Sequence, residues 1–193
     1  ALGSFLAEAI ADTMSDGREW PVLSVIVCSW RQGKYIEETI RSILLQGYPK
    51  LQFIIMDGAS DDNTVEIIEK YDKWISFWHS EPDKGQSDAI NKAFKKVTGD
   101  VVAWQNSDDI YYANAFRRAI ELLWPSPVLD AVYGSTVSTD PESKITSTLE
   151  EAYESAFNLA DMIPWPNLHN EALFIRRSVL PADHLVDGSW KRC

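Results

Sequence analysis

The fold class is decided by residues 23–46, which read LSVIVCSWRQGKYIEETIRSILLQ. This stretch opens with a short apolar run, continues with polar residues, and closes with a segment from Tyr35 to Gln46 whose apolar residues recur at helical spacing. An apolar run followed at once by an amphipathic helix is the repeating unit of a buried parallel sheet covered by helices. The stretch therefore predicts one such unit.

The same alternation continues as far as Val137, so the chain is predicted to be an α/β protein. The expected strands are Leu23–Cys28, Leu51–Met56, Trp74–Trp78, Asp100–Trp104 and Ala131–Tyr133. The expected helices are Tyr35–Gln46, Thr64–Trp74, Ser87–Val97 and Ala113–Leu123. We expect an N-terminal helical extension over residues 1–20, with an amphipathic helix from Leu2 to Met14. A single domain is expected over residues 21–193, and its truncation at the C-terminus is an open alternative.

The charge balance excludes one broad class of partner. Among the 193 residues, 18 Lys and Arg stand against 29 Asp and Glu, which gives a formal net charge of −11. Binding to nucleic acid needs clustered Lys and Arg, so no nucleic-acid partner is expected. No apolar run approaches the roughly 20 residues that span a bilayer, and the two cysteines are too few for a disulfide framework. We therefore expect a soluble, cytoplasmic protein without a transmembrane segment.

Polar residues follow the expected strands of the first half of the chain. Parallel strands bring their carboxyl ends to one edge of the sheet, and ligands of open α/β sheets bind in the crevice beyond that edge. The polar loops are Ser29–Lys34, Asp57–Thr64, Glu81–Asp88 and Asn106–Asp109. We therefore expect these loops to converge on one site.

Two adjacent carboxylates, Asp108 and Asp109, follow the apolar end of the fourth expected strand. They repel each other at neutral pH, so a compensating cation is expected. Mg²⁺ or Mn²⁺ is typically shared between one or two carboxylates and substrate phosphates. The alternative is a helix cap, because Ser107, Asp108 or Asp109 could cap a helix that begins near Tyr111. On the residues alone, both interpretations stay open.

Asp57 ends the second expected strand and is poorly placed to cap the helix that follows. Two hypotheses remain for its carboxylate. It either accepts an N–H from a nucleotide base, or it is a loop carboxylate held by backbone amides.

Four stretches follow one another in unbroken order over roughly residues 22–136. They are residues 23–43 (LSVIVCSWRQGKYIEETIRSI), 57–64 (DGASDDNT), 80–91 (SEPDKGQSDAIN) and 99–109 (GDVVAWQNSDD). Together they resemble glycosyltransferase family 2, and a fainter match runs over residues 170–180 (NEALFIRRSVL). The resemblance implies a GT-A fold, with a mixed and mainly parallel sheet flanked by helices. It also implies a nucleotide-diphosphate sugar donor and a divalent metal ion, Mn²⁺ or Mg²⁺.

The resemblance also implies roles for individual residues. Those at the nucleotide are Ser29, Asp57, Gln86, Asp88 and Asn106. Among them, Asp57 contacts the base, commonly uracil, and the loop that carries Asp88 lies near the ribose and diphosphate. The triplet from Asn106 to Asp108 takes the place of the family's Asp-x-Asp signature, with Asp108 as the foremost metal ligand and Asp109 as the next.

The predicted reaction is inverting transfer of a sugar from a UDP-sugar to a hydroxyl of a carbohydrate or lipid-linked acceptor, a chemistry that allows a peripheral place at the membrane face. Inversion needs a carboxylate to take the acceptor's proton. The available carboxylates are Glu171, Asp183 and Asp187, and none matches the family's acidic motif. Two alternatives stay open: a donor-binding module or fragment without turnover, and a nucleotidyltransferase, whose expected glycine- and lysine-rich loop is missing.

Overall fold

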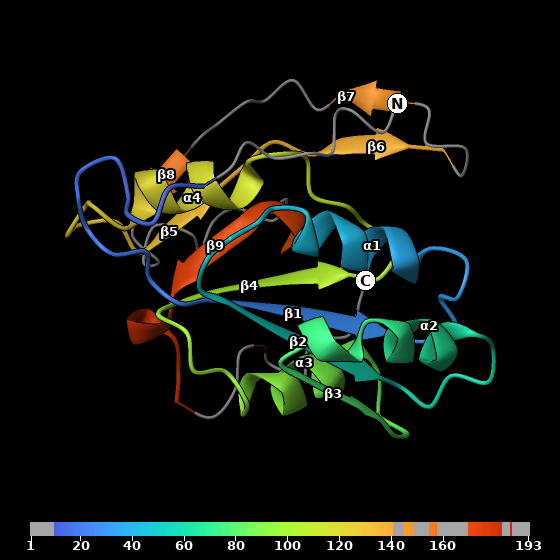
Figure 1. The fold of residues 1–193 in the computed structure, drawn as a ribbon. Helices are drawn as coiled ribbons and strands as arrows, with labels where there is room; N and C mark the ends of the chain where they lie inside the picture. The colour runs from blue at the N-terminus through green and yellow to red at the C-terminus, as the bar shows by residue number, and fades with distance from the viewer. Residues whose placement is uncertain (1–9, 141–144, 149–154, 158–169, 183–185, 187–193) are drawn as a thin grey trace.

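The computed structural model describes residues 10–140, 145–148, 155–157, 170–182 and 186. Its main element is a seven-stranded sheet in the order β3-β2-β1-β4-β9-β5-β8, and β6 pairs with β7 in a separate sheet (Figure 1). The strands are β1 (Leu23–Ser29), β2 (Leu51–Asp57), β3 (Phe77–Ser80), β4 (Val101–Asn106), β5 (Ala131–Tyr133), β6 (Val137–Thr139), β7 (Ile145–Thr148), β8 (Ser155–Phe157) and β9 (Leu173–Arg176). The α-helices are α1 (Ile36–Leu44), α2 (Thr64–Lys70), α3 (Gln86–Phe94) and α4 (Ala115–Leu123), and the 3-10 helices are η2 (Asp72–Trp74), η4 (Asn170–Ala172) and η5 (Arg177–Val179).

The sheet is mixed, as predicted. β1 pairs in parallel with β2 and β4, and β2 pairs in parallel with β3. β9 lies antiparallel between β4 and β5, so β4 and β5 still run in the same direction, and β8 runs antiparallel to β5. The strands β1 to β5 therefore share one direction, and their carboxyl ends lie on one edge of the sheet.

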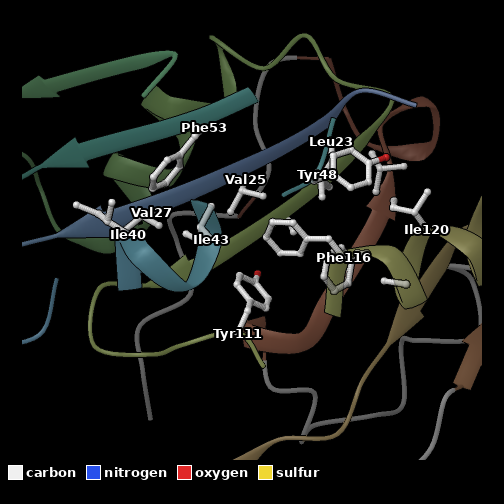
Figure 2. Close-up of a cluster of buried hydrophobic side chains, with 14 of the residues drawn as sticks. Leu23, Val25, Val27, Ile40, Ile43, Tyr48, Phe53, Tyr111, Phe116 and Ile120 are labelled. Atoms are coloured by element: carbon white, nitrogen blue, oxygen red, sulfur yellow. The ribbon is translucent and has the colours of Figure 1, made fainter. Parts of the chain in front are cut away.

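Apolar side chains of β1 alternate between the two faces of the sheet, as they do in any strand buried on both sides. Leu23, Val25 and Val27 pack against apolar residues of α1, α2 and α4 in the larger core (Figure 2). Ile26 packs on the opposite face, in a cluster with Ala89, Ala93 and Phe94 of α3. α3 therefore covers one face of the sheet, and the other helices cover the second.

Three expected elements differ most from the structure. The second helix was predicted over Thr64–Trp74, but α2 ends at Lys70 and Asp72–Trp74 forms the 3-10 helix η2. The third strand was predicted over residues 74–78 but spans Phe77–Ser80, because Trp74 ends the 3-10 helix η2 and the chain becomes extended only from Ile75. The predicted amphipathic helix over Leu2–Met14 is wrong for the residues that the structure describes, 10–14. There Thr13 forms an antiparallel bridge with Glu19, and the indole N–H of Trp20 donates to the carbonyl of Ala11 at 2.9 Å. The rest of that helix lies outside the described residues.

The region after β5 contains four strands that the local sequence pattern did not locate, β6, β7, β8 and β9. β9 inserts into the sheet with Val101 opposite Arg176 and Ala103 opposite Phe174. Arg176 fixes this insertion, because its guanidinium donates to the carbonyls of Leu123, Ser126 and Leu129 at 2.6–2.8 Å. Within the described ranges, no helix is both long and apolar enough to cross a membrane.

Candidate functional site

The polar residues that close the parallel strands lie side by side at one edge of the sheet. Ser29 of β1 is in register with Asp57 of β2, and Asp57 is in register with Ser80 of β3. On the other side of β1, Asn106 of β4 stands opposite Cys28. The predicted convergence of these strand ends is therefore present, and Ser80 joins them.

Asp57 is held from three directions. Its side chain is buried, with 1% of the residue surface exposed. Oδ2 accepts the backbone N–H of Ser60 at 2.9 Å and the hydroxyl of Ser80 at 2.6 Å, while Oδ1 accepts the hydroxyl of Ser60 at 2.5 Å. The geometry fits the loop-carboxylate hypothesis, although two of the three donors are hydroxyls and only one is a backbone amide. A carboxylate has about four acceptor positions, so room for one further donor remains.

The loop after β2 is joined to the loop after β1 by hydrogen bonds. Asp62 accepts the backbone N–H of Gly33 and the hydroxyl of Thr64, at 3.0 and 2.5 Å, and the hydrogen bond from Thr64 lowers the pKa of Asp62 below its usual range. Arg31 pairs with Asp61 at 2.5 Å. These contacts hold the two loops together.

Trp30 stands on this ordered edge. It is 61% exposed, and its Cδ1 atom would lie 3.4 Å from a Cβ built on Gly58. An exposed indole held against a glycine turn offers a flat apolar surface to a ligand.

Ser29, a predicted site residue, has its hydroxyl buried at this edge. The residue is 5% exposed, and its Oγ atom has no hydrogen-bond partner in the part of the chain that the structure describes. A buried hydroxyl without a partner destabilises a protein by about 1–3 kcal/mol. A ligand at this edge would supply the missing partner.

Asn106 joins its neighbour Asp109 to two residues that are distant in sequence, Gln86 and Glu171. Its Oδ1 atom accepts the side-chain N–H of Gln86 at 2.5 Å. Its Nδ2 atom donates to Oδ2 of Asp109 at 2.8 Å and to Oε1 of Glu171 at 3.0 Å. Four predicted site residues, from α3, β4, the following loop and η4, therefore form one connected group.

The two adjacent carboxylates after β4 do not cap a helix. α4 begins at Ala115 with Asn114 as its N-cap, so the expected cap by Ser107, Asp108 or Asp109 is wrong. Asp109 is partly buried and bound by Asn106. Asp108 is exposed and makes no hydrogen bond or ion pair with any residue that the structure describes.

Asp108 and Asp109 fit a divalent cation whose remaining ligands are water and substrate phosphate. No group of three or more His, Cys, Asp or Glu side chains that could hold a metal occurs among residues 10–140, 145–148, 155–157, 170–182 and 186. Mg²⁺ and Mn²⁺ sites with one or two carboxylates complete their shell with water and substrate phosphate. Asp108, with Asp109 beside it, is such a partial set.

Asp88 makes its contacts at the start of its own helix. It lies in the first turn of α3, where its carboxylate accepts the backbone N–H of Lys84 at 3.1 Å and pairs with Lys92 at 3.3 Å. The hydrogen bond from Lys84 is the main cause that lowers the pKa of Asp88. In the structure Asp88 serves its own helix start, and its contact with a ribose or diphosphate stays a prediction. Asp183 and Asp187 lie outside the described residues.

Sequence reasoning gave no role to two residues of this edge, Ser80 and Tyr111. Ser80 is the last residue of β3, as Ser29 is of β1 and Asp57 of β2, so its place at the strand end is the signal that could have found it. Tyr111 is buried, and the charges of Glu171 and Asp109 add to the effect of burial in raising the pKa of its hydroxyl. No local pattern marks that position.

Several proteins and structures are similar to this chain. A protein of Bacillus subtilis (strain 168) named as a teichuronic acid biosynthesis glycosyltransferase, TuaG, is 34% identical over 106 residues, which is 53% of this chain and 42% of that protein. An uncharacterised glycosyltransferase of Nostoc sp. is 25% identical over 179 residues, which is 86% of this chain and 54% of that protein. The chain thus spans about half the length of the curated relatives it matches.

Solved structures share the fold. The mannosyltransferase PcManGT from Pyrobaculum calidifontis, in complex with GDP-Man and Mn²⁺, has a TM-score of 0.62 at 23% identity, covering 86% of this chain and 50% of its own. S. aureus TarS 1–349 in complex with UDP-GlcNAc has a TM-score of 0.64 at 22% identity, covering 80% of this chain and 45% of its own. The mixed sheet and its flanking helices are therefore those of the GT-A fold. The family model of glycosyl transferase family 2 also matches residues 24–182, so the chain belongs to glycosyl transferase family 2.

Proposed function

We propose that this chain carries the donor site of an inverting glycosyltransferase that uses a UDP-sugar together with Mn²⁺ or Mg²⁺. The observation that carries the proposal lies at the end of β4. Asn106 and Asp109 are held in one hydrogen-bonded group, whereas Asp108 between them is exposed and makes no hydrogen bond or ion pair among the described residues. A carboxylate so placed, on an edge built from strand ends, is suited to a cation that also contacts phosphate.

The nucleotide would lie across the ends of β1 and β2. Ser29 offers its buried hydroxyl there, and Asp57 keeps an acceptor position for a base N–H beside the exposed face of Trp30. A guanine ring also carries N–H donors, so Asp57 alone does not separate UDP from GDP. The complexes of TarS with UDP-GlcNAc and of PcManGT with GDP-Man show that both nucleotides occur among structures of this fold.

Transfer leaves a diphosphate whose negative charge must be stabilised. A divalent ion, when bound, acts as a Lewis acid on that leaving group. Asp108 and Asp109 would hold it, and Asn106 would keep Asp109 in place. These residues would thus orient the donor. Attack of the acceptor hydroxyl on the sugar also needs a group that takes the proton of that hydroxyl.

The proton acceptor is not assigned to one residue. Asp183 and Asp187 lie outside the described residues. Glu171 lies in the site, but its Oε1 atom already accepts a hydrogen bond from Asn106 at 3.0 Å. The acceptor is proposed to be a carbohydrate or a lipid-linked saccharide, in keeping with the relative named for teichuronic acid biosynthesis.

The proposal is tested by calorimetric titration of the chain with UDP, with GDP as comparison, each with and without Mn²⁺. We expect UDP binding that Mn²⁺ strengthens, and we expect Asp108→Ala to reduce the Mn²⁺-dependent part at least about tenfold. Asp12→Ala, which removes an exposed aspartate of the N-terminal turn, is the matched control. Metal-independent binding in the wild type, or an Asp108→Ala variant equal to the control, contradicts the proposal.

A donor-binding module without turnover is the second candidate. It is favoured by the hydrogen bond from Asn106 that already occupies Oε1 of Glu171, the candidate proton acceptor among the described residues. Incubation of the chain with UDP-sugars and Mn²⁺ separates the two candidates, because release of sugar shows turnover, whereas UDP binding without any release of sugar favours the module.

A further inference from the structure

A carboxylate from the second half of the chain reaches the end of β4. Glu171 lies in η4, directly before β9, and β9 is the strand inserted between β4 and β5. Its Oε1 atom accepts a hydrogen bond from Nδ2 of Asn106, and the same Nδ2 atom donates to Asp109. Because Gln86 holds the Oδ1 atom of Asn106, the whole amide group is fixed. Its orientation thus depends on residues from three separate segments.

A second group that bears on this site is the buried hydroxyl of Tyr111. Tyr111 is 5% exposed, its ring packs edge-on against Phe116 at a centroid distance of 4.8 Å (Figure 2), and its backbone N–H donates to the hydroxyl of Ser42. Its Oη atom has no hydrogen-bond partner in the described part of the chain.

An unpartnered buried hydroxyl is unfavourable for the ligand-free protein. A phenylalanine would fill the same space against Phe116 without that penalty. The charges of the Asp109 and Glu171 carboxylates act on this hydroxyl, and Asp109 is a proposed cation ligand. A donor group beside such a ligand can hold the carboxylate in orientation while the ion is bound, as partners of metal ligands commonly do.

We propose that Glu171 and Tyr111 are positioning residues for the cation and diphosphate, an inference that rests on the proposed function. Glu171 fixes Asn106, and through it the turn that presents Asp108 and Asp109. Tyr111 donates its hydroxyl to the Asp109 and Glu171 pair in the donor-bound state. This role differs from that of a general base, which would need Glu171 to face the acceptor hydroxyl.

The test is titration of UDP, with and without Mn²⁺, into Glu171→Ala, Glu171→Gln and Tyr111→Phe. We expect Glu171→Ala and Tyr111→Phe to weaken Mn²⁺-dependent binding about tenfold, with metal-free UDP affinity within about twofold of the wild type. Glu171→Gln keeps an oxygen that can accept from Asn106, so it should lose less than Glu171→Ala. Tyr111→Phe should also melt at the same or a higher temperature than the wild type. Glu69→Ala and Tyr112→Phe are the matched controls, since both side chains are exposed.

Each way in which the inference can fail gives a different experimental result. Mn²⁺-dependent affinity equal to that of the controls removes the positioning role. Equal losses with and without Mn²⁺, together with a lower melting temperature, show a structural role only. Turnover abolished in Glu171→Gln with donor binding intact makes Glu171 a base. If the wild type itself shows no Mn²⁺-dependent UDP binding, the proposed function fails and this inference falls with it, whereas a normal wild type with normal variants removes this inference alone.

Discussion

The loops after β2 and after β4 both carry adjacent aspartates at the same edge of the sheet, yet the protein uses them differently. In the β2 loop, Asp61 pairs with Arg31, and Asp62 accepts hydrogen bonds from Gly33 and Thr64. In the β4 loop, Asp109 is held by Asn106, and Asp108 makes no hydrogen bond or ion pair among the described residues. Adjacent carboxylates alone therefore do not indicate a cation site. The informative feature is a carboxylate that the surrounding residues leave available.

The largest effect expected from this comparison concerns stability. Asp57→Ala removes a buried acceptor and leaves the hydroxyls of Ser60 and Ser80 without it, so we expect the free energy of unfolding to fall by about 2–4 kcal/mol. Asp108→Ala removes an exposed carboxylate and should change it by less than about 0.5 kcal/mol. Urea denaturation followed by tryptophan fluorescence measures both. Similar losses in the two variants would show that Asp108 is also a structural residue.

The next effect concerns Ser29, which lies in β1 and in neither of the two aspartate loops. Ser29→Ala should leave the free energy of unfolding unchanged or raise it by up to about 1 kcal/mol, because the hydroxyl has no partner in the described part of the chain. UDP affinity should fall about fivefold, which corresponds to about 1 kcal/mol. Calorimetry and thermal melts give the two numbers, with the exposed Ser138→Ala as control. A destabilised variant with unchanged UDP affinity would assign Ser29 to the fold instead of the nucleotide.

The smallest effect is the pH dependence of the β2 loop. The hydrogen bonds to Asp62 lower its pKa in the folded state below the ordinary value of 3.8, so its contribution to stability is present above that value. The contribution is lost as the pH falls through the lower folded pKa. Between about pH 5 and about pH 3, the melting temperature of Asp62→Asn should therefore fall less than that of the wild type. Parallel curves for the two proteins would mean that Asp62 titrates alike in the folded and unfolded chain.

Part of this edge was predictable from the sequence because its signals are local. Ser29, Asp57 and Asn106 each close an apolar run, and parallel strands place such residues together whatever the details of the loops. The helix-cap alternative for Asp108 was wrong because α4 begins later, at Ala115, after Asn114 with its positive φ of 67°. A start set by one left-handed residue is not visible in the hydrophobic pattern.

The contribution of Glu171 could not be placed in the same way. It depends on β9, which runs antiparallel between β4 and β5 and pairs Val102 with Ile175. A short apolar strand of this kind has the same pattern whichever neighbours it joins. The place of Glu171, directly before β9, therefore followed only from the order of the strands in the sheet. The same holds for the interaction of the Tyr111 hydroxyl with Glu171.

The central claim is that Asp108 and the ends of β1, β2 and β4 form the site of a nucleotide diphosphate with its cation. A crystal structure of the chain with UDP and Mn²⁺, using the anomalous signal of manganese, tests it most directly. The account predicts manganese at Asp108, in contact with the diphosphate, and uracil near Asp57 and Trp30. Manganese or uridine bound elsewhere, with Asp108 still exposed to solvent, would contradict it.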